Sequence, residues 1–223
     1  MRRREVLAGA AAALAAGPAA AAAGARLWTF ERLDRIGGRP ALALGAPVSM
    51  AGAVAFDGVD DALLVGEHPL AGAGAFTIEA VFRPDGGAFA QRWLHLAQDA
   101  GDAGVSGGTR MLFEIRVTDA GWYLDAFVKG PGYGRTLADP AKLHPLGAWA
   151  HVAQVCDGRR YASYVDGALQ AQGEIAFRPQ GPGRTSIGVR MNRVDWFRGA
   201  IRELRFTPRA LTPDRFSRQR APA

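Results

Sequence analysis

The chain has 223 residues, enough for one well-buried domain. Its 27 Lys and Arg outnumber its 21 Asp and Glu, giving a formal net charge of +6. No window combines a clustered basic run with interleaved aromatic residues, so nucleic acid is not expected as a partner. The single cysteine, Cys156, excludes an intrachain disulfide and is expected to pack as a small apolar group.

The first 24 residues have the pattern of an export signal. The segment "MRRREVLAGAAAALAAGPAAAAAGA" combines a basic start, an Ala-rich stretch and several A-x-A cleavage sites. Arg3 and Arg4, followed at a short spacing by Val6 and Leu7, resemble the twin-arginine export signal. A Sec signal and an uncleaved anchor are the alternatives. The anchor is disfavoured because the stretch is short and is interrupted by Gly and Pro.

From this pattern we predict a signal peptide over residues 1–24, cleaved between Ala19 and Ala25, and a single domain over residues 25–223. The partner in export is then the twin-arginine machinery. The mature protein is expected in the periplasm or outside the cell, with no stable membrane span after signal cleavage.

The rest of the chain alternates apolar and polar residues in short runs separated by Gly, Pro and Asp. "AFTIEAVFRP", "MLFEIRV" and "WYLDAFV" each place their apolar residues on one face, as half-buried strands do. One short helix is predicted after Thr212, in "TPDRFSRQ". Short strands at this spacing indicate an all-β sandwich or barrel. Further strands are predicted at 27–30, 53–57, 61–65, 92–97, 184–190 and 199–207, and Gly-rich loops at 71–74, 99–108 and 129–135.

Residues 150–173 are predicted to form three strands of an antiparallel meander. Asp166-Gly167 suits a type I′ turn, whose two central positions need a positive φ, and Asp157-Gly158 marks the preceding turn. The second turn would leave one apolar and one polar face on the ribbon. It would pair Val165 with Ala168, Tyr164 with Leu169, Ser163 with Gln170, Ala162 with Ala171 and Tyr161 with Gln172.

Strands 111–117 and 122–128 are predicted to form a hairpin, and two registers keep their apolar faces matched. In one register Glu114 lies opposite Asp125 and Arg116 opposite Tyr123. In the other, Arg116 pairs with Asp125. The first register places two carboxylates side by side, which is costly unless a proton, a cation or a substrate relieves it. The ion-paired register is therefore the favoured one.

Three stretches, in this order, resemble a known family. They are "AVAFDGVDDALLVGEHPLAGAGAFTIEAVFRP", "LGAWAHVAQVCDGRRYASYVDGALQ" and "SIGVRMNRVDWFRGAIRELRFTPRALTPDRF". Together they are similar to the LamG-like jellyroll domain of the concanavalin A-like lectin/glucanase superfamily, over about residues 50–216. The resemblance implies an all-β, two-sheet antiparallel jellyroll sandwich. It implies little about activity, because the family includes carbohydrate binders, calcium-dependent adhesion modules, domains appended to hydrolases, and enzymes.

The glycosidases of similar fold carry an E-x-D-x-(x)-E strand, and the nearest match here is "FEIRVTD". Arg116 stands in the place of the central acid, which argues against retaining glycosidase chemistry. The candidate ligand-binding residues are instead the polar and aromatic side chains on the non-core face of the 111–129 ribbon: Glu114, Arg116, Tyr123, Asp125 and Phe127.

A ring, a guanidinium and a carboxylate on one face suit a sugar, although a plain solvated sheet face is the alternative. Tyr123, Arg116 and Asp125 are expected to be the main contacts. A Tyr123→Ala change should therefore weaken glycan binding and leave the melting temperature little changed.

Calcium is the candidate cofactor. Ca²⁺ takes hard oxygen ligands, and two stretches supply them: Asp57, Asp60 and Asp61 in "FDGVDD", and Asn192 and Asp195 in "MNRVDW". Neither has EF-hand spacing, so a turn and a solvated loop are the alternatives. The leading hypothesis is an exported, non-enzymatic module that binds a glycan or envelope polysaccharide. A polysaccharide hydrolase or lyase and a structural envelope protein remain the competing hypotheses.

Overall fold

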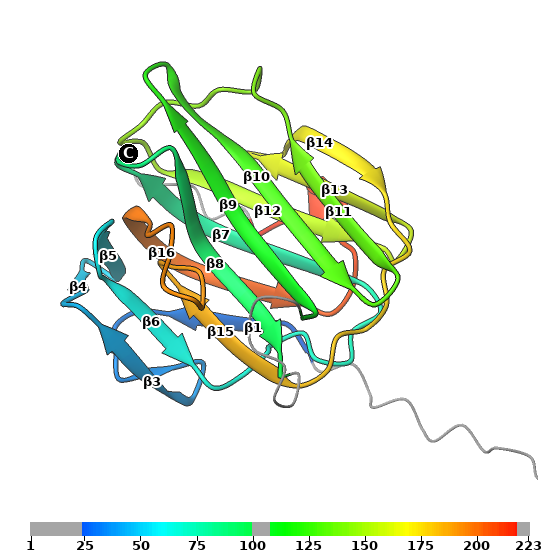
Figure 1. The fold of residues 1–223 in the computed structure, drawn as a ribbon, viewed down its shortest axis with the longest axis horizontal. Coiled ribbons are helices and arrows are strands. Elements are labelled where there is room, and N and C mark those ends of the chain that lie inside the picture. The colour runs from blue at the N-terminus through cyan, green and yellow to red at the C-terminus, as the bar shows by residue number, and fades with distance from the viewer. Residues whose placement is uncertain (1–23, 100–107, 218–223) are drawn as a thin grey trace, which may run out of the picture.

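The computed structural model describes residues 24–99 and 108–217. Within these ranges the chain forms sixteen strands and one 3-10 helix. The strands build two antiparallel sheets that pack face to face, with β8, β9 and β10 in front of β7 and β12 in Figure 1. The predicted two-sheet antiparallel sandwich is confirmed. No helix in the described ranges has the length and apolar character needed to cross a membrane.

Each sheet joins strands that are distant in the sequence, as a jellyroll requires. Sheet 1 has the order β14 (Ala168–Glu174), β13 (Arg160–Val165), β12 (Ala150–Cys156), β7 (Phe76–Pro84), β16 (Arg198–Thr207), β5 (Ala53–Asp57) and β4 (Val48–Met50), and β1 (Arg26–Thr29) also pairs with β16. Sheet 2 has the order β11 (Tyr133–Ala138), β10 (Gly121–Gly130), β9 (Arg110–Thr118), β8 (Ala90–Gln98), β15 (Gly183–Ile187), β6 (Ala62–Val65), β3 (Arg39–Leu44) and β2 (Arg35–Ile36).

The core lies between the sheets and consists of the apolar faces that the alternation predicted. Met111, Phe113, Ile115 and Val117 of β9 all belong to it, as do Trp122, Leu124, Ala126 and Val128 of β10. Phe82 of sheet 1 packs against Trp93 and Trp122 of sheet 2, with ring centroids 5.3 and 5.1 Å away. Because the apolar faces of β9 and β10 point inward, their polar residues lie on the outer face of sheet 2.

Residues 150–173 form the predicted three-strand meander, with one correction. Asp166 and Gly167 have φ angles of 48° and 81°, as a type I′ turn requires. Val165 pairs with Ala168 and Tyr164 with Leu169, but Gln170 is then bulged out of the register. Beyond Gln170, the predicted β14 partner of each β13 residue is therefore wrong by one position. The bulge lets the Gln170 side chain bond to His144 Nε2, 2.8 Å away.

Several elements were missed or misjudged from the sequence. Strands β2 and β4 were not predicted because they have only two and three residues. Strands β3 and β11 were also missed, although β3 ends in four Ala and Leu residues. Of the Gly-rich loops, 129–135 is the tip of a hairpin in which Gly130 pairs with Tyr133. The predicted helix after Thr212 is a single 3-10 turn, Pro213–Arg215, without a side-chain cap. Most of the predicted loop 99–108 lies outside the described residues.

Cys156 behaves as expected of a small apolar group. It is fully buried at the end of β12. Burial raises the pKa of its thiol to about 11, so the thiolate needed for nucleophilic chemistry is not populated near neutral pH. The cysteine therefore belongs to the core and contributes no reactive group.

Candidate functional site

The hairpin of β9 and β10 adopts the register that the sequence analysis disfavoured. Tyr123 lies opposite Arg116, and Asp125 lies directly opposite Glu114. The predicted pairing of Arg116 directly across from Asp125 is therefore wrong as a register. The ion pair forms all the same, because the Arg116 side chain reaches diagonally to Asp125.

Two arginines offset the repulsion between the facing carboxylates. Arg116 Nη2 lies 2.9 Å from Glu114 Oε2 and 2.6 Å from Asp125 Oδ2. Arg92 of β8 adds a second cation, with its Nε 2.9 Å from Glu114 Oε1 and its Nη1 2.6 Å from Asp195 Oδ2. These five residues, which we call the ion-pair cluster, form one continuous network on the outer face of sheet 2. A planar guanidinium with several donors can serve two carboxylates at once.

Asp195 comes to the cluster from the loop after β15, outside the hairpin. This loop is tied to β8 by the backbone bond from Arg92 N to Asp195 O, 2.8 Å long. Arg193 and Asp195 both have positive φ angles, 60° and 59°, a conformation that is uncommon for residues other than glycine. The tight turn brings the Asp195 carboxylate back over Arg92. The Asp195 carboxylate thus forms its ion pair with Arg92, and Asn192 of the same loop is exposed to solvent.

The cluster is sheltered from solvent, which changes the acidity of its carboxyls. Glu114 is 3 % exposed and Asp125 is 8 % exposed. Burial raises the pKa of Glu114; Arg92 opposes the shift and Asp125 adds to it. Burial also raises the pKa of Asp125, against the effects of Arg116 and Arg92. Low local dielectric strengthens each ion pair and each repulsion, so the network holds a defined geometry.

The aromatic residues of this face differ in accessibility. Tyr123, the predicted stacking ring, is only 9 % exposed. Its strand register puts it on the non-core face as expected, but its surface is largely covered. Phe127 is partly exposed, and the Arg110 guanidinium lies over its ring, 5.1 Å from the centroid. Phe127 is therefore the more accessible ring of the predicted set.

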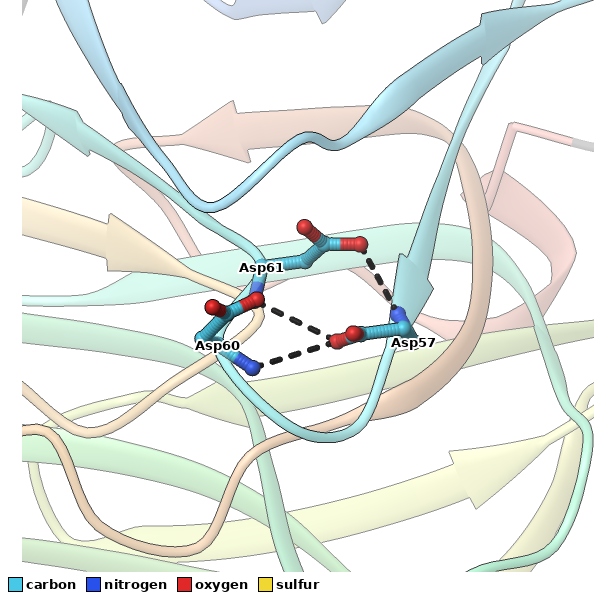
Figure 2. A group of neighbouring side chains, drawn as sticks. All are labelled: Asp57, Asp60 and Asp61. Atoms are coloured by element: carbon cyan, nitrogen blue, oxygen red, sulfur yellow. Dashed lines mark hydrogen bonds between the residues drawn. The ribbon is translucent and has the colours of Figure 1, made fainter.

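Three of the five predicted metal ligands come together in the turn after β5. Figure 2 shows the three side chains, Asp57, Asp60 and Asp61, at one turn, with the Asp57 carboxylate directed at the backbone N–H groups of Asp60 and Asp61 and the Asp61 carboxylate directed at Asp57 N. One carboxylate oxygen of each lies within 4.8 Å of the others. The remaining two, Asn192 and Asp195, belong to the loop already described, and Asp195 is not part of this group. The two stretches are thus not joined in one acidic group.

Much of this acidic group is occupied by backbone hydrogen bonds. Asp57 Oδ1 accepts bonds from the N–H groups of Val59, Asp60 and Asp61, at 2.8, 3.2 and 3.3 Å. Desolvation would raise the pKa of Asp57, but these three bonds hold it below its ordinary value. Asp61 is 7 % exposed and accepts bonds from Ala46 N and Asp57 N. The aspartates therefore shape the turn, as the alternative interpretation predicted.

The group also fits a hard cation in charge and in ligand type. Asp60 is exposed, and its carboxylate makes no hydrogen bond with the described part of the chain. The backbone at Gly45 approaches so closely that a Cβ there would lie 2.5 Å from Asp61 Oδ1 and 2.6 Å from Asp60 Oδ1. Three carboxylates held together by the fold repel one another unless a proton or cation intervenes.

Sequence reasoning missed Arg92 and Arg110, which complete the outer face of sheet 2. Strand 92–97 was predicted, but its neighbours in the sheet were not. Arg92 lies opposite Glu114, and Ala97 lies opposite Arg110. A bulge at Trp93 separates the two positions and resets the alternation. No local signal in the sequence gives either the pairing or the bulge.

The chain was compared with known proteins. A family model described as the concanavalin A-like lectin/glucanases superfamily matches residues 57–216. Among solved structures, domain 4 of AbnA is similar over 87 % of this chain and 97 % of its own, with 17 % identity and a TM-score of 0.61. AbnA is a GH43 extracellular arabinanase from Geobacillus stearothermophilus, and this domain was solved in complex with arabinotriose.

Two further structures are similar at lower identity. The IT-sialidase CBM40 of Ruminococcus gnavus, bound to alpha2,3 sialyllactose, is 16 % identical, covering 77 % of this chain and 94 % of its own, with a TM-score of 0.54. The binding domain of Botulinum Neurotoxin DC in complex with SialylT is 10 % identical, covering 86 % of this chain and 49 % of its own, with a TM-score of 0.60. At these identities the likeness concerns the fold. A comparison with curated proteins found no match.

Proposed function

Because this chain belongs to the concanavalin A-like lectin/glucanase superfamily, we propose that it is an exported, non-enzymatic carbohydrate-binding module. Its ligand is a glycan, such as a polysaccharide of the envelope or the surroundings. The binding surface is the outer face of sheet 2, where strands β8, β9 and β10 carry the ion-pair cluster and Phe127.

The ion-pair cluster is the observation that carries this proposal. It places directed donors and acceptors next to a partly exposed ring, and each charged group is held in place by another. A sugar needs these two elements, because its hydroxyls demand oriented hydrogen bonds and its C–H face packs on aromatic surface. A site held by mutual ion pairs is preorganised, so binding orders few side chains.

The solved neighbours support the proposal in a general way. Two of the three described above were solved with an oligosaccharide, arabinotriose in one and sialyllactose in the other. The domain of AbnA also belongs to an extracellular enzyme, which agrees with the export proposed here. The family fold, rather than any shared residue, is the basis of this support.

A polysaccharide hydrolase is the second candidate, and one observation favours it. Glu114 and Asp125 are buried, face each other across two strands and have raised pKa values, which is the setting of acid–base pairs in glycosidases. Against it, Arg116 binds both carboxylates at once. A carboxylate held by a guanidinium is a weaker nucleophile and a poorer proton acceptor, so we favour binding without turnover.

Calcium is proposed as a structural ion at Asp57, Asp60 and Asp61. The support is the charge of three neighbouring carboxylates and their hard oxygen atoms. The ion would lower their mutual repulsion and so stabilise the turn after β5. Because this group and the ion-pair cluster share no residue, removing calcium is expected to lower the melting temperature and to leave the glycan face unaltered.

The test is a glycan array of neutral and acidic polysaccharides, run with calcium and with a chelator, together with a reducing-sugar release assay. Phe127→Ala is expected to weaken binding by about 1 kcal/mol, the scale of an aromatic contact. The matched control is Trp149→Ala. Trp149 is also partly exposed, but its ring contacts the guanidinium groups of Arg83 and Arg202 of sheet 1.

The outcomes separate the hypotheses. Binding without sugar release, weakened only by Phe127→Ala, supports the binding module. Sugar release would establish the hydrolase instead. A loss of binding in the Trp149 variant alone would move the site to sheet 1. Absence of binding across the whole array would leave the structural envelope protein as the remaining hypothesis and would reject our proposal.

A further inference from the structure

A second group of cations lies on the outer face of sheet 2, beside the ion-pair cluster. Arg110 of β9 is directly opposite Lys129 of β10. Residues paired in this way point their side chains to the same face, so two like charges stand next to each other across the strands. Such a pair is destabilising unless something neutralises it. We call Arg110, Lys129 and the neighbouring Arg190 the basic group.

Arg190 reaches this pair from the loop after β15. The loop is fixed over the sheet by the bond from Met191 N to His95 Nδ1, 3.0 Å long. Arg190 lies near enough to Arg110 and to His95 for its charge to act on both. Burial lowers the pKa of Arg110, and the charge of Arg190 lowers it further, with only a smaller opposing effect from Glu114. Two guanidinium groups are thus held close together by the fold.

The carboxylates of this face do not neutralise the basic group. Glu114, Asp125 and Asp195 are all bound to Arg92 or Arg116 in the ion-pair cluster. Among residues 24–99 and 108–217, no carboxylate forms an ion pair with Arg110, Lys129 or Arg190. The charge of the cluster is therefore largely balanced, whereas that of the basic group is not.

The basic group also lacks hydrogen-bond acceptors. Arg110 Nε, Arg190 Nε and His95 Nε2 are all buried, and none of them has a partner in the described ranges. Since His95 Nδ1 accepts the bond from Met191 N, the proton of the neutral ring is on Nε2, which is a donor. Burial, together with the charges of Arg190, Arg110 and Arg92, lowers the pKa of His95 to about 3, so the ring is neutral. Each buried donor without an acceptor carries a free-energy cost.

Arg110 is held in the orientation that a bound anion would use. Its guanidinium lies over the ring of Phe127 and donates from Nη1 to Gly108 O at 3.2 Å, its only hydrogen bond within the described residues. An aromatic ring beneath the guanidinium fixes its plane and leaves its N–H edges free for a planar or tetrahedral anion. The stacking also joins the basic group to the ring proposed as the sugar contact.

From this arrangement we propose that the ligand of this face is an acidic glycan, and that Arg110, Lys129 and Arg190 bind its carboxylate or sulfate group next to Phe127. This inference rests on the proposed function and names the substrate class. An anionic oxygen group supplies the negative charge that the basic group lacks, together with acceptors for its accessible N–H groups. A neutral sugar supplies hydroxyl groups but no charge, and it would leave the Arg110–Lys129 repulsion in place.

The experiment compares pairs of polysaccharides that share one backbone. Polygalacturonate and its methyl ester differ in carboxylate charge, and a sulfated galactan and its desulfated form differ in sulfate. The acidic member of at least one pair is expected to bind roughly tenfold or more tightly than the neutral member, the scale of a charged hydrogen bond. Its affinity should fall when salt rises from about 0.1 M to about 1 M, because the Debye length shrinks from about 10 Å to about 3 Å. The pair that responds identifies the anion.

The variant is Arg110→Gln with Lys129→Gln. It should reduce binding of the acidic glycan by roughly tenfold or more and leave the neutral form unaffected. The matched control, Arg159→Gln with Arg209→Gln, removes the same charge from exposed positions elsewhere. An unfolding curve for each variant shows that the fold is kept. Because removing unneutralised like charges relieves repulsion, the first variant is expected to be at least as stable as the parent.

Three results would overturn the inference. Equal binding of acidic and neutral members would show that charge is not recognised. An equal loss in both double variants would show a non-specific effect of net charge. Binding of neutral glycans alone would reject the acidic ligand but leave the proposed module in place, whereas the absence of all glycan binding would reject the module itself.

Discussion

Arginine side chains organise the outer face of sheet 2 at the scale of single residues. Glu114 and Asp125 face each other in a register that would be unfavourable for two isolated carboxylates. Arg116 binds both, and Arg92 binds Glu114 from the other side. The cations thereby turn a repulsive pair into the centre of a network. Arg110 has no such carboxylate partner in the described residues, and it therefore contributes to a site that attracts an anion.

Arg116→Gln is expected to destabilise the protein by about 3 kcal/mol, because it leaves two sheltered carboxylates facing each other without their shared cation. Arg116, Glu114 and Asp125 have side chains that are 17, 4 and 11 % exposed, so solvent screens the pair only weakly. Urea unfolding of the variant and the parent measures the difference. The control is Arg184→Gln, which breaks an ion pair with Asp99 whose partners are 60 and 57 % exposed. It should cost less than about 1 kcal/mol.

The loss in Arg116→Gln should depend on pH in a defined direction. Folding raises the pKa values of Glu114 and Asp125, so their contribution to stability is present at low pH and is lost as pH rises through the folded values. Removing Arg116 raises both values further. The cost of the variant should therefore be larger at about pH 7 than at about pH 4. A cost that is the same at both values would contradict this account.

At the scale of elements, tight turns set which residues face each other. The Asp166-Gly167 turn fixes the β13–β14 pairing close to the turn, and the bulge at Gln170 then shifts the rest of it. The β10–β11 hairpin likewise places Gly130 opposite Tyr133, and the Tyr133 ring occupies the space that a Cβ at Gly130 would need. The local backbone conformation is thus as decisive for the sheets as the apolar alternation.

Gly167→Ala is expected to destabilise the protein by about 1 kcal/mol, because alanine is disfavoured at a φ of 81°. Gly66→Ala is the matched control. At both positions a new Cβ would meet no atom within 4 Å, but Gly66 does not have a positive φ. The control should be neutral or slightly stabilising. Thermal or urea unfolding of both variants measures the difference, and equal effects would show that the turn conformation is not the cause.

At the scale of the whole molecule, one continuous apolar core joins the two sheets. Phe82 contacts Trp93, Trp122 and Phe197 in the interior. Within this core the only cysteine is buried and free. A fold that needs no disulfide can form before export, and the twin-arginine route carries proteins that are already folded. Such a fold is compatible with the twin-arginine signal proposed for residues 1–24. The signal and the domain over 25–223 stay predictions, and residues 1–23 lie outside the described ranges.

Changing Arg3 and Arg4 together to Lys is expected to abolish export, because the arginine pair is the feature that the twin-arginine machinery recognises. The measurement is the distribution of the protein between the cell interior and the exported fraction. Arg2→Lys is the matched control, since it alters a neighbouring arginine and preserves the pair. Export that continues unchanged in the double variant would reject this route and leave secretion by another route as the explanation.

The sequence by itself determined the fold class, most of the strands and the inward faces. Alternation with a period of two assigned Met111, Phe113 and Ile115 to the core, and the Asp-Gly pairs marked the turns. These properties depend on neighbours within a few residues along the chain. Local pattern therefore sufficed for them, and it also placed Glu114, Arg116 and Phe127 together on the opposite face.

Only the tertiary structure decided the register of β9 and β10, the covering of Tyr123 and the identity of the cations around the carboxylates. Both registers satisfy the apolar alternation equally, and Arg92, which pairs with Glu114 in the observed register, lies 22 positions before it in the chain. The basic group likewise forms from β9, β10 and a loop after β15, which share no sequence motif. Electrostatic interactions act through space, so the fold had to bring these side chains together before their charges could define a site.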